Sequence, residues 1–300
     1  MKCSYCEKES IIFIRRTGKH YCEDHFNQFL LGRVKKYLDK HRIKNKRIMV
    51  AVSGGKDSTV MLHVLWQLSE KYNLEIIPFY LDLGIKEYSK PCGKSVREIS
   101  EMLGLNLIEV GLLDFAGFTI DDVAKKEKKP CRVCGVVKRY IMNRIAFENN
   151  FDFVATGHTM IDEAAFAIHN LYSGNIDQFF RAYEITRTEK ERKLVGRIKP
   201  LYYLMETETL TYALINRIPY CDLECPYAEG HPIQKQKEIL FEGEYKFPGF
   251  IYNILRSLNK IRKKVPLENS VQVKFCKICG YPTTGDVCNF CKVKMKYSKR

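Results

Sequence analysis

The sequence predicts an α/β fold, a doubly wound parallel sheet with a small cysteine-rich module at each end of the chain. Two observations support this prediction. Through the middle of the chain, short apolar runs alternate with segments of helical periodicity, which is typical of parallel sheets. Closely spaced cysteines gather near both ends of the 300 residues. We expect one module over 1–30, a catalytic domain over 31–268 and a second module over 269–300.

The central elements follow one another in chain order. An apolar run rich in β-branched residues, 47–52, precedes the glycine loop SGGKDS at 53–58, and apolar residues with helical spacing follow it. The remaining predicted elements are strands at 74–84, 106–113 and 151–158, and helices at 93–105, 133–150, 162–175, 205–220 and 247–265. Ligands of such sheets bind at the carboxyl ends of the strands. The loop at 53–58, Asp82, Gly157 and His158 all fall at that edge.

The SGGKDS loop predicts a site for nucleotide phosphates. Its glycines let the backbone approach an anion, and its serines and N–H groups donate hydrogen bonds at a helix N-terminus. Its lysine adds positive charge, and its aspartate can help hold the Mg²⁺ that a nucleotide carries. The loop is not a Walker A sequence, which requires a longer spacing. The predicted nucleotide-binding residues are Ser53, Gly54, Gly55, Lys56, Asp57 and Ser58.

Two cysteine groups have the spacing of zinc sites. At the start of the chain, Cys3 and Cys6 are followed by Cys22 and His25, which offers four ligands for a tetrahedral ion. His20 is a weaker alternative to His25, because it lacks the two-residue spacing from Cys22. Each segment is too short for an apolar core of its own, so we expect zinc to supply its folding energy.

The group near the end of the chain is a zinc-ribbon pattern. Two C-x-x-C pairs, Cys276 with Cys279 and Cys288 with Cys291, are joined by a short loop that contains glycine. Together the two groups use seven of the twelve cysteines. Five remain in the middle of the chain: Cys92, Cys131, Cys134, Cys221 and Cys225.

The net charge of +15 indicates a polyanionic partner, nucleic acid before membrane, although a solvated surface is the simpler alternative. The predicted helix at 247–265 is basic and amphipathic, and we expect it to contact phosphates. Its cations are Arg256, Lys260, Arg262, Lys263 and Lys264. There is no signal peptide and no apolar run of membrane-spanning length, so we expect a cytoplasmic protein without membrane contact.

The order of motifs resembles one group of enzymes. SGGKDS is the PP-loop of the ATP pyrophosphatases, which split ATP into AMP and pyrophosphate. Within that superfamily, the chain resembles the TtuA/NcsA group of tRNA 2-thiolation enzymes. The matching parts span the chain: CSYC with CEDH, SGGKDS, LDLGI, PCRVCGVVKRY, TGHTMIDEA, ECPY and the terminal ribbon.

The resemblance implies a [4Fe–4S] cluster held by three cysteines, here Cys131, Cys134 and Cys225. With three protein ligands for four irons, one iron stays open to a sulfur ligand. Cys221 complicates this, because a fourth thiolate would close the cluster; we interpret it as a packed thiol. Cys92 has no partner at a characteristic spacing and is interpreted as a small buried residue.

The resemblance also implies roles for other residues and partners. Lys138 would neutralise phosphate charge, Asp162 would orient Mg²⁺ or assist proton transfer, and Gly157 would let the chain approach the nucleotide. Asp82 would contact the ribose or the metal, and His158 is a secondary candidate. The implied cofactors are ATP with Mg²⁺, the cluster and two structural Zn²⁺. The implied partners are tRNA, a second copy of the chain, and a sulfur donor, either sulfide or a ubiquitin-like thiocarboxylate carrier.

The expected reaction has two steps. ATP adenylates the C2 oxygen of a tRNA uridine and releases pyrophosphate, and sulfur then attacks C2 and expels AMP. Three alternatives remain open at this point. One is a different PP-loop ligase or synthetase, the second is thiolation through a persulfide on Cys131 or Cys134 without a cluster, and the third is a non-catalytic nucleic-acid-binding protein.

Overall fold

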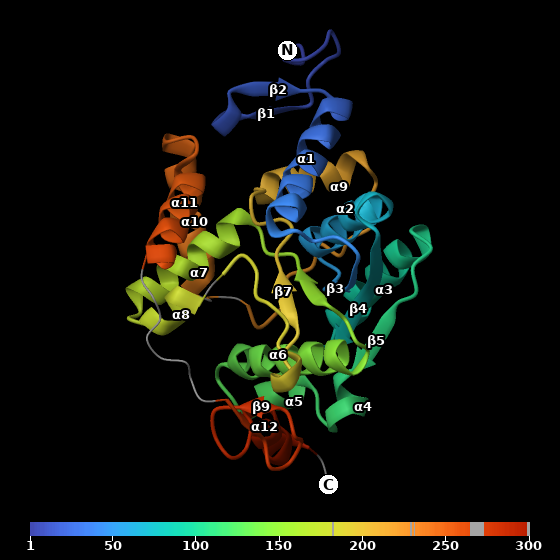
Figure 1. Ribbon diagram of the computed structural model, residues 1–300, viewed down its shortest axis with the longest axis vertical. Coiled ribbons are helices and arrows are strands. Elements are labelled where there is room, and N and C mark those ends of the chain that lie inside the picture. Colours follow the sequence, from blue (N-terminus) through green and yellow to red (C-terminus); the bar gives the residue numbers. More distant parts are fainter. Residues whose placement is uncertain (182, 229, 231, 265–272, 299–300) are drawn as a thin grey trace.

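A five-stranded parallel sheet forms the centre of the protein (Figure 1). The computed structural model describes residues 1–181, 183–228, 230, 232–264 and 273–298. The strand order is β5-β4-β3-β6-β7, with every neighbouring pair parallel. The strands are β3 (Lys46–Ala51), β4 (Leu74–Asp82), β5 (Ile108–Gly111), β6 (Phe153–Thr156) and β7 (Gly196–Ile198). The predicted doubly wound α/β sheet is therefore confirmed.

Helices cover both faces of the sheet, which explains why its strands read as continuous apolar runs. One face carries α2 (Lys56–Tyr72), α3 (Ser89–Met102) and α7 (Met160–Tyr172). Outside these helices pack α1 (Glu23–His41), α9 (Glu206–Ile215), α10 (Pro232–Lys246) and α11 (Phe250–Lys264). The other face carries α4 (Leu112–Ala116), α5 (Ile120–Ala124) and α6 (Pro130–Glu148). The residues that the structure describes accordingly form two hydrophobic cores. Ile48 and Val50 of β3 enter the first, and Met49 enters the second.

The N-terminal module is a β-hairpin that leads directly into α1. The hairpin consists of β1 (Ile12–Ile14), the short 3-10 helix η1 (Arg15–Thr17) and β2 (Lys19–Tyr21). It is fixed to the central domain by Arg16, whose buried guanidinium pairs with Glu208 at the start of α9. The boundary predicted at residue 30 lies inside α1, so the module and the central domain share one continuous helix.

The C-terminal module packs on α6. It comprises β8 (Lys274–Phe275), β9 (Pro282–Thr283) and α12 (Asn289–Tyr297). The ring of Phe290 stacks on that of Tyr140 with centroids 3.9 Å apart, and Tyr297 hydrogen-bonds Glu127. The module therefore braces the helix that begins with Cys131 and Cys134. The boundary predicted at residues 268 and 269 lies outside the described residues.

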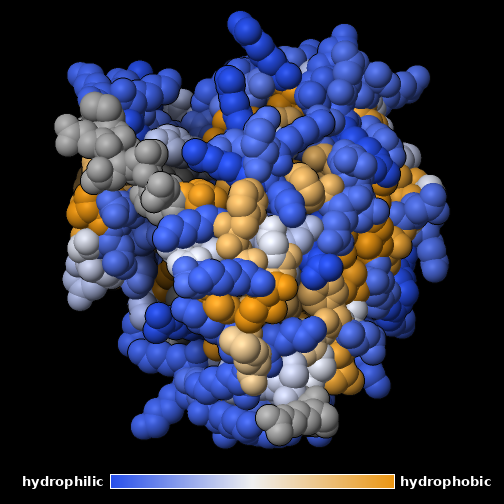
Figure 2. Space-filling view, turned by 60° about the horizontal axis from the view of Figure 1, so that its bottom comes forward, coloured by the Kyte–Doolittle hydropathy of each residue, from blue (hydrophilic) through white to orange (hydrophobic). Residues whose placement is uncertain are grey.

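The surface is largely hydrophilic on the side where this C-terminal module comes forward, with apolar residues gathered across the middle of that view (Figure 2).

Two short helical segments lie between α7 and β7. They are α8 (Ile176–Arg181) and η2 (Lys190–Arg192). Within the part of the chain that the structure describes, no helix combines the length and apolar character needed to cross a membrane.

The predicted elements differ from the observed ones in three respects. The helices α2 and α6 begin earlier than predicted, at Lys56 and Pro130, so that Lys56 and Cys131 lie in their first turns. The sequence patterns did not predict α1, α10 or the three-residue strand β7. Arg262 of α11, which is predicted to contact phosphates, is instead buried and donates from Nε to the carbonyl of Phe179 at 2.9 Å.

Candidate active site

The SGGKDS loop lies where the strand order reverses. It connects β3 to α2, and β6 is the next strand on one side while β4 lies on the other. The hydroxyl of Ser58 organises it: Ser53 N donates to Ser58 Oγ at 3.1 Å, and Ser58 Oγ donates to the Gly55 carbonyl at 2.8 Å. The loop therefore presents its backbone at the N-terminus of α2, a position suited to an anion.

Gly54 is required by the local geometry. Its φ of +90° is in the region that favours glycine, and a Cβ at this position would lie 2.5 Å from the carbonyl oxygen of Cys92. The carbonyl of Gly54 also accepts a hydrogen bond from Cys221 N at 2.8 Å. The loop is thus held between α3, which carries Cys92, and the segment that follows α9.

Gly157, which follows β6, packs directly on the loop. A Cβ here would lie 3.0 Å from Ser58 Cα and 3.1 Å from Ser58 N, both of them backbone atoms. A side chain would have to push β6 away from the SGGKDS loop, residues 53–58, which we call the phosphate loop. Gly157 therefore sets the distance between the two strand ends that form the site.

We expect Gly157→Ala to raise the KM for ATP about 10-fold or more and to destabilise the fold by about 1–3 kcal/mol, the usual cost of overpacking. Gly32→Ala is the matched control. Gly32 lies in α1, a Cβ there would meet no atom within 4 Å, and alanine is a better helix former than glycine. ATP kinetics and thermal unfolding measure both effects. An unchanged KM in Gly157→Ala would show that the distance between the two strand ends does not affect nucleotide binding.

A hollow of about 520 Å³ lies over the phosphate loop. Besides loop residues, it is lined by Lys138 of α6, His158 after β6, and Cys221 and Glu224 from the segment after α9. A smaller hollow of about 110 Å³, lined by Phe79, Leu83 and Met142 among others, shares Ser53 and Lys138 with it. Lys138 therefore lies where the hollow over the phosphate loop meets the smaller, more apolar one.

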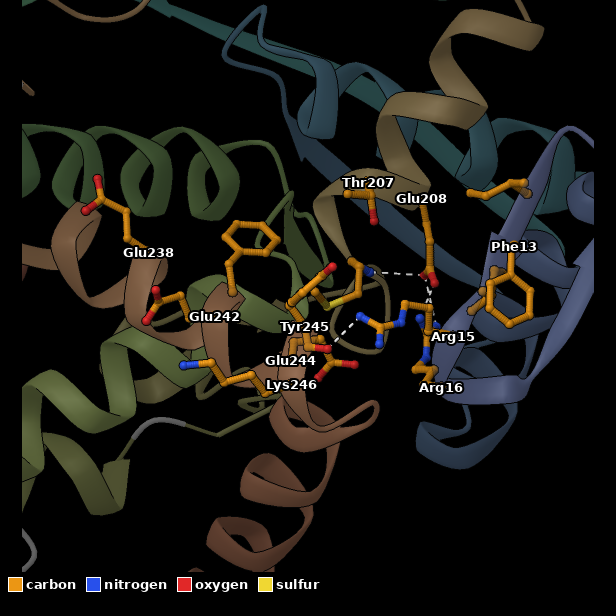
Figure 3. A pocket seen from close by; sticks show the side chains of 14 residues that line it. Phe13, Arg15, Arg16, Thr207, Glu208, Glu238, Glu242, Glu244, Tyr245 and Lys246 are labelled. Carbon is orange, nitrogen blue, oxygen red and sulfur yellow. Dashed lines mark hydrogen bonds and ion pairs between the residues drawn. The ribbon is translucent and has the colours of Figure 1, made fainter.

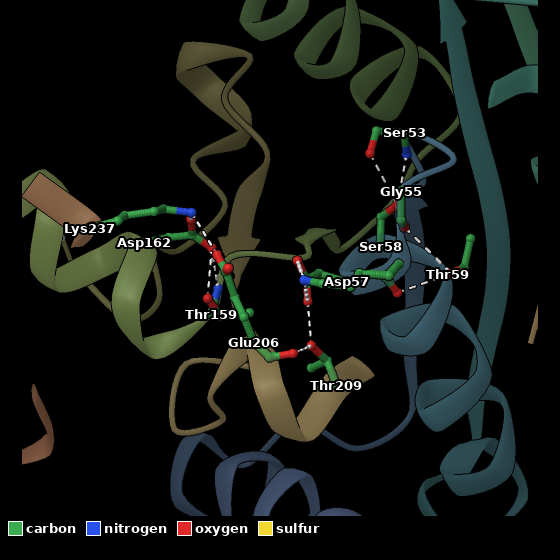
Figure 4. Close-up of polar contacts among 11 residues, drawn as sticks. Ser53, Gly55, Asp57, Ser58, Thr59, Thr159, Asp162, Glu206, Thr209 and Lys237 are labelled. Atoms are coloured by element: carbon green, nitrogen blue, oxygen red, sulfur yellow. Dashed lines mark hydrogen bonds and ion pairs between the residues drawn. The ribbon is translucent and has the colours of Figure 1, made fainter. Parts of the chain in front are cut away.

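Asp57 is linked to its neighbours by polar contacts (Figure 4). Lys56 Nζ lies 2.9 Å from Asp57 Oδ2, and Thr209 of α9 donates to Asp57 Oδ1. Burial raises the pKa of Asp57, although Lys56 acts in the opposite direction. Thr209 was not predicted as a site residue, and nothing in its sequence context indicates this contact.

Asp162 makes contacts that differ from its expected role (Figure 4). It caps α7: Thr159 N and Thr159 Oγ1 both donate to Asp162 Oδ2 at 2.8 Å. Its other oxygen pairs with Lys237 of α10, which also donates to Glu206. Asp162 lines neither of the two hollows at the phosphate loop, whereas Asp57 lines the larger one. We therefore propose that Asp162 positions the loop after β6 and does not bind Mg²⁺ itself.

Asp82 and His158 lie at the predicted sheet edge but differ in their relation to the hollow. Asp82 Oδ1 accepts from Gly84 N at 2.7 Å in a tight turn, and Asp82 lines neither of the two hollows. His158 does line the larger hollow, and its Nδ1 lies 3.0 Å from Thr156 Oγ1. The geometry therefore favours His158 over Asp82 as a group close to a bound nucleotide.

Cys131, Cys134 and Cys225 come together beside this hollow. The first two lie in the first turn of α6, and Cys225 follows α9. The thiol of Cys131 donates to the carbonyl of Tyr227 at 2.9 Å, which joins the two segments. Burial raises the pKa of Cys131, the neighbouring Cys225 raises it further, and Lys138 lowers it. Cys225 and Lys138 are therefore both close enough to Cys131 to affect its charge.

The spacing of these thiols differs from that of the two terminal groups. Among the described residues, only the terminal groups have three or more ligand atoms all within 4.8 Å of one another: Cys3, Cys6, Cys22 and His25, and Cys276, Cys279, Cys288 and Cys291. Thiolates on one tetrahedral zinc lie about 3.8 Å apart, given a Zn–S bond of about 2.3 Å. The terminal groups fit a single ion, whereas the central three are more widely spaced.

His20, the weaker alternative ligand, lies outside the N-terminal group. Its ring stacks on that of Phe13 with centroids 4.4 Å apart. His25 Nδ1 lies 3.3 Å from Cys22 Sγ and 3.5 Å from Cys6 Sγ. The choice of His25 over His20 therefore agrees with the geometry.

Cys221 and Cys92 form a pair of their own. Their sulfurs lie 2.9 Å apart, and the two residues are 9% and 1% exposed. The Cys221 sulfur is thus directed towards α3, where Cys92 is located. No sequence pattern indicates this pair, because 129 residues separate its members.

A larger hollow of about 890 Å³ lies away from the phosphate loop, between the N-terminal hairpin and α10 (Figure 3). Arg15 crosses it, donating to the Tyr245 carbonyl at 2.6 Å with its guanidinium 4.7 Å from the centre of the Tyr245 ring. Its walls combine apolar side chains, among them Phe13 and Phe241, with charged ones, among them the Arg16–Glu208 pair and Glu244. This hollow lies at the contact between the hairpin and the central domain. Its described lining residues include no group of nucleophiles.

Comparison with known proteins identifies the family. A model of the PP-loop domain matches residues 27–225, and a model of the N-terminal LIM domain of the 2-thiouridine synthetase TtuA matches residues 2–27. A tRNA-5-methyluridine(54) 2-sulfurtransferase of Pyrococcus horikoshii is 37% identical, covering 97% of this chain and 93% of that protein. The chain belongs to the PP-loop family of tRNA 2-thiolation enzymes.

Other relatives of this PP-loop enzyme extend the match. A protein of the same name from Thermotoga maritima is 34% identical over the whole chain and 98% of its own length. The solved U34-tRNA thiolase NcsA of Methanococcus maripaludis, described with its [4Fe–4S] cluster, superposes with a TM-score of 0.82 at 30% identity, covering 93% of this chain and 92% of that one. Residues 273–292 match the model of the four-cysteine zinc-finger domain of RecR.

Proposed function

We propose that this PP-loop enzyme is a tRNA uridine 2-sulfurtransferase that adenylates the C2 oxygen of a uridine with ATP and replaces that oxygen by sulfur. The observation that carries the proposal is the position of Lys138. It lines the hollow over the phosphate loop and also lies one helical turn beyond Cys134. The hollow proposed for the nucleotide therefore lies beside α6, the helix that carries Cys131 and Cys134. A reaction that first activates and then thiolates one atom requires the two sites to be neighbours.

The three central thiols suit an iron–sulfur cluster better than a single ion. Iron–sulfur clusters are bound by thiolates, and a four-iron cluster needs ligands further apart than one zinc does. We propose Cys131, Cys134 and Cys225 as its ligands, and we leave Cys221 out because its sulfur contacts Cys92. With three thiolates, the cluster supplies one iron to which a sulfur atom for transfer can bind.

The residues of the chain would divide the remaining work. The backbone of the phosphate loop would bind the ATP phosphates at the N-terminus of α2. Lys56 and Lys138 would neutralise the charge that develops as pyrophosphate leaves, and Asp57 would hold the Mg²⁺ that ATP carries. The apolar hollow between Phe79 and Met142 would receive the adenine ring. The uridine would enter from the side of Cys131 and Cys134, splayed out of its tRNA loop.

We also propose that each terminal group holds one structural Zn²⁺. The four ligand atoms of each group lie within 4.8 Å of one another, which suits a closed tetrahedral site. In the N-terminal group the ion would join the loop before β1 to the first turn of α1. In the C-terminal group it would hold the ribbon against α6.

We expect His25→Ala to lower the zinc content by one ion per chain and to lower the Tm by roughly 5–10 °C, because a structural zinc contributes folding free energy. His20→Ala is the matched control. It removes a neighbouring imidazole that stacks on Phe13 and is not directed into the group. Metal analysis and thermal unfolding test the pair, and equal zinc loss in both variants would contradict the assigned ligands.

A basic hollow on α11 is the proposed contact for the tRNA backbone. It measures about 600 Å³ and is lined by Lys40, Arg256, Lys260 and Lys263, with Tyr183 at the surface. The acidic residue among its walls, Glu184, already accepts from Lys40 and Tyr203 at 2.6 Å. The remaining cations are therefore available for phosphates.

Reversing two of these charges, Lys260→Glu with Lys263→Glu, is expected to weaken tRNA binding about 10-fold or more in 0.1 M salt. The slope of log K against log salt should fall by about 1 for each phosphate that the variant no longer neutralises. A double variant on α2 and α3, Lys71→Glu with Lys94→Glu, changes the net charge equally. Equal weakening by both double variants would show that the effect is one of total charge and not of this surface.

We further propose uridine 54 as the target. Two relatives named as tRNA-5-methyluridine(54) 2-sulfurtransferases are 37% and 34% identical to this chain, whereas the U34-tRNA thiolase is 30% identical. The test is an anaerobic reaction of the protein with unmodified tRNA, ATP and sulfide, followed by nuclease mapping and mass spectrometry. A 2-thiouridine at position 54 is expected, and one at position 34 would refute the assignment.

A further inference from the structure

Cys92 and Cys221 are the two thiols for which the proposed reaction has no use. They come from distant segments, the first turn of α3 and the loop after α9. Their sulfurs are nevertheless 2.9 Å apart, which is close enough for a disulfide to form with a small movement of the two side chains.

The two thiols differ in their access to solvent. Cys221 lines the hollow over the phosphate loop, whereas Cys92 lies behind it and does not line that hollow. A small molecule entering the hollow would therefore reach Cys221 first. The same hollow is the proposed site of the ATP phosphates, so a bound nucleotide would close this route.

The two cysteines also lie on either side of Gly54 in the phosphate loop. Cys221 N donates to the carbonyl of Gly54, and the missing Cβ of Gly54 leaves room for the backbone of Cys92. A bond between the two sulfurs would join α3 to the segment that carries Cys225 four residues later. Oxidation would thus lock the loop and the Cys225 segment in one arrangement.

We propose that Cys92 and Cys221 form a peroxide-reactive dithiol site that a bound nucleotide protects. The thiolate of Cys221 attacks one peroxide oxygen, the O–O bond breaks, and Cys221 becomes a sulfenic acid while the other oxygen leaves as hydroxide or alkoxide. The sulfur of Cys92 then attacks the Cys221 sulfur, and the sulfenic oxygen leaves as water with the Cys92 proton. The two thiols are oxidised by two electrons in total, and the peroxide is reduced.

The dithiol chemistry needs neither the cluster nor the tRNA reaction, so it can fail or succeed independently of thiolation. Only the protection by nucleotide rests on the proposed ATP site. The oxidised pair is a disulfide that a dithiol reagent should reduce again.

The experiment is peptide mapping of the full-length chain after treatment with about one equivalent of hydrogen peroxide and blocking of remaining thiols. Trypsin yields Cys92 in peptide 87–94 and Cys221 with Cys225 in peptide 218–235. We expect these two peptides to be cross-linked through Cys92 and Cys221. The same cross-link is expected in Cys225→Ala and absent in Cys92→Ala.

ATP with Mg²⁺ at saturating concentration should slow cross-linking by about 10-fold or more, since one route of access is closed. The proposal is overturned if peroxide gives no cross-link, or if fragmentation places it on Cys225. A cross-link that forms equally fast with and without ATP would overturn the route through the nucleotide hollow.

Discussion

Cys225→Ala is expected to abolish tRNA thiolation and to remove most of the bound iron while leaving the zinc content unchanged. The loss should exceed about 100-fold, because even the removal of an outer-shell partner of a metal ligand costs roughly 10–100-fold. In the proposed ligand set, Cys225 comes from a different segment than the C-x-x-C pair, so its loss would leave two thiolates in one helical turn. Two such thiolates cannot surround a four-iron cluster.

This variant separates the proposed mechanism from the persulfide alternative. A persulfide on Cys131 or Cys134 could pass its sulfur on with the other thiol forming a disulfide, and Cys225 would not be needed. Cys92→Ala is the matched control, since it removes a buried central thiol outside the proposed ligand set. Activity that survives in Cys225→Ala, or that is lost equally in Cys92→Ala, would contradict the three-ligand site.

Lys138→Met is the second large effect that we expect, a fall in kcat of about 100-fold or more with iron and zinc retained. Removing a single preorganised group that stabilises transition-state charge has this order of effect. Lys138 lines both hollows at the site, so its ammonium would be within reach of the phosphate oxygens of the proposed nucleotide. Burial raises the pKa of Cys134, and Lys138 opposes this rise. The substitution keeps a flexible side chain of similar length and removes only the charge.

Lys138→Arg distinguishes charge from shape, because it restores the positive charge with a different head group. We expect this variant to recover a substantial part of the lost kcat, measured as thiouridine formed per enzyme per unit time at saturating ATP and tRNA. If Lys138→Met thiolates at the normal rate, the lysine has no part in the chemistry. If it loses its iron, Lys138 supports the cluster site and not the phosphate charge.

The fold could be predicted from the sequence wherever a pattern is local. The strands β3, β4 and β6 are apolar runs with β-branched residues, and a glycine loop followed by helical spacing marks the α2 N-terminus. The three-residue strand β7 is too short to show a pattern, and α10 mixes charged and apolar residues along its length. These two elements are specified by what they pack against.

Two side chains could have been placed more accurately from patterns already present. Thr159 and Asp162 have the spacing of a capping box, which predicts the contacts that Asp162 makes with Thr159. Arg262 is seven residues beyond Leu255 and eleven beyond Ile251, on the same side of α11 as these buried residues. The pairing of Cys92 with Cys221 could not be predicted, because it depends on how α3 and the loop after α9 meet at Gly54.

We propose that thiolation depends on a cluster held by Cys131, Cys134 and Cys225 beside the phosphate loop. The most direct measurement compares two anaerobic preparations of the wild-type chain, one with iron and sulfide incorporated and one free of iron, both with zinc bound. Each is given tRNA, ATP and a sulfur source, and 2-thiouridine is quantified by mass spectrometry. We predict that only the iron-loaded protein forms thiouridine and that it releases one AMP for each thiouridine. An equal yield of thiouridine from the iron-free protein would contradict the dependence of thiolation on the cluster.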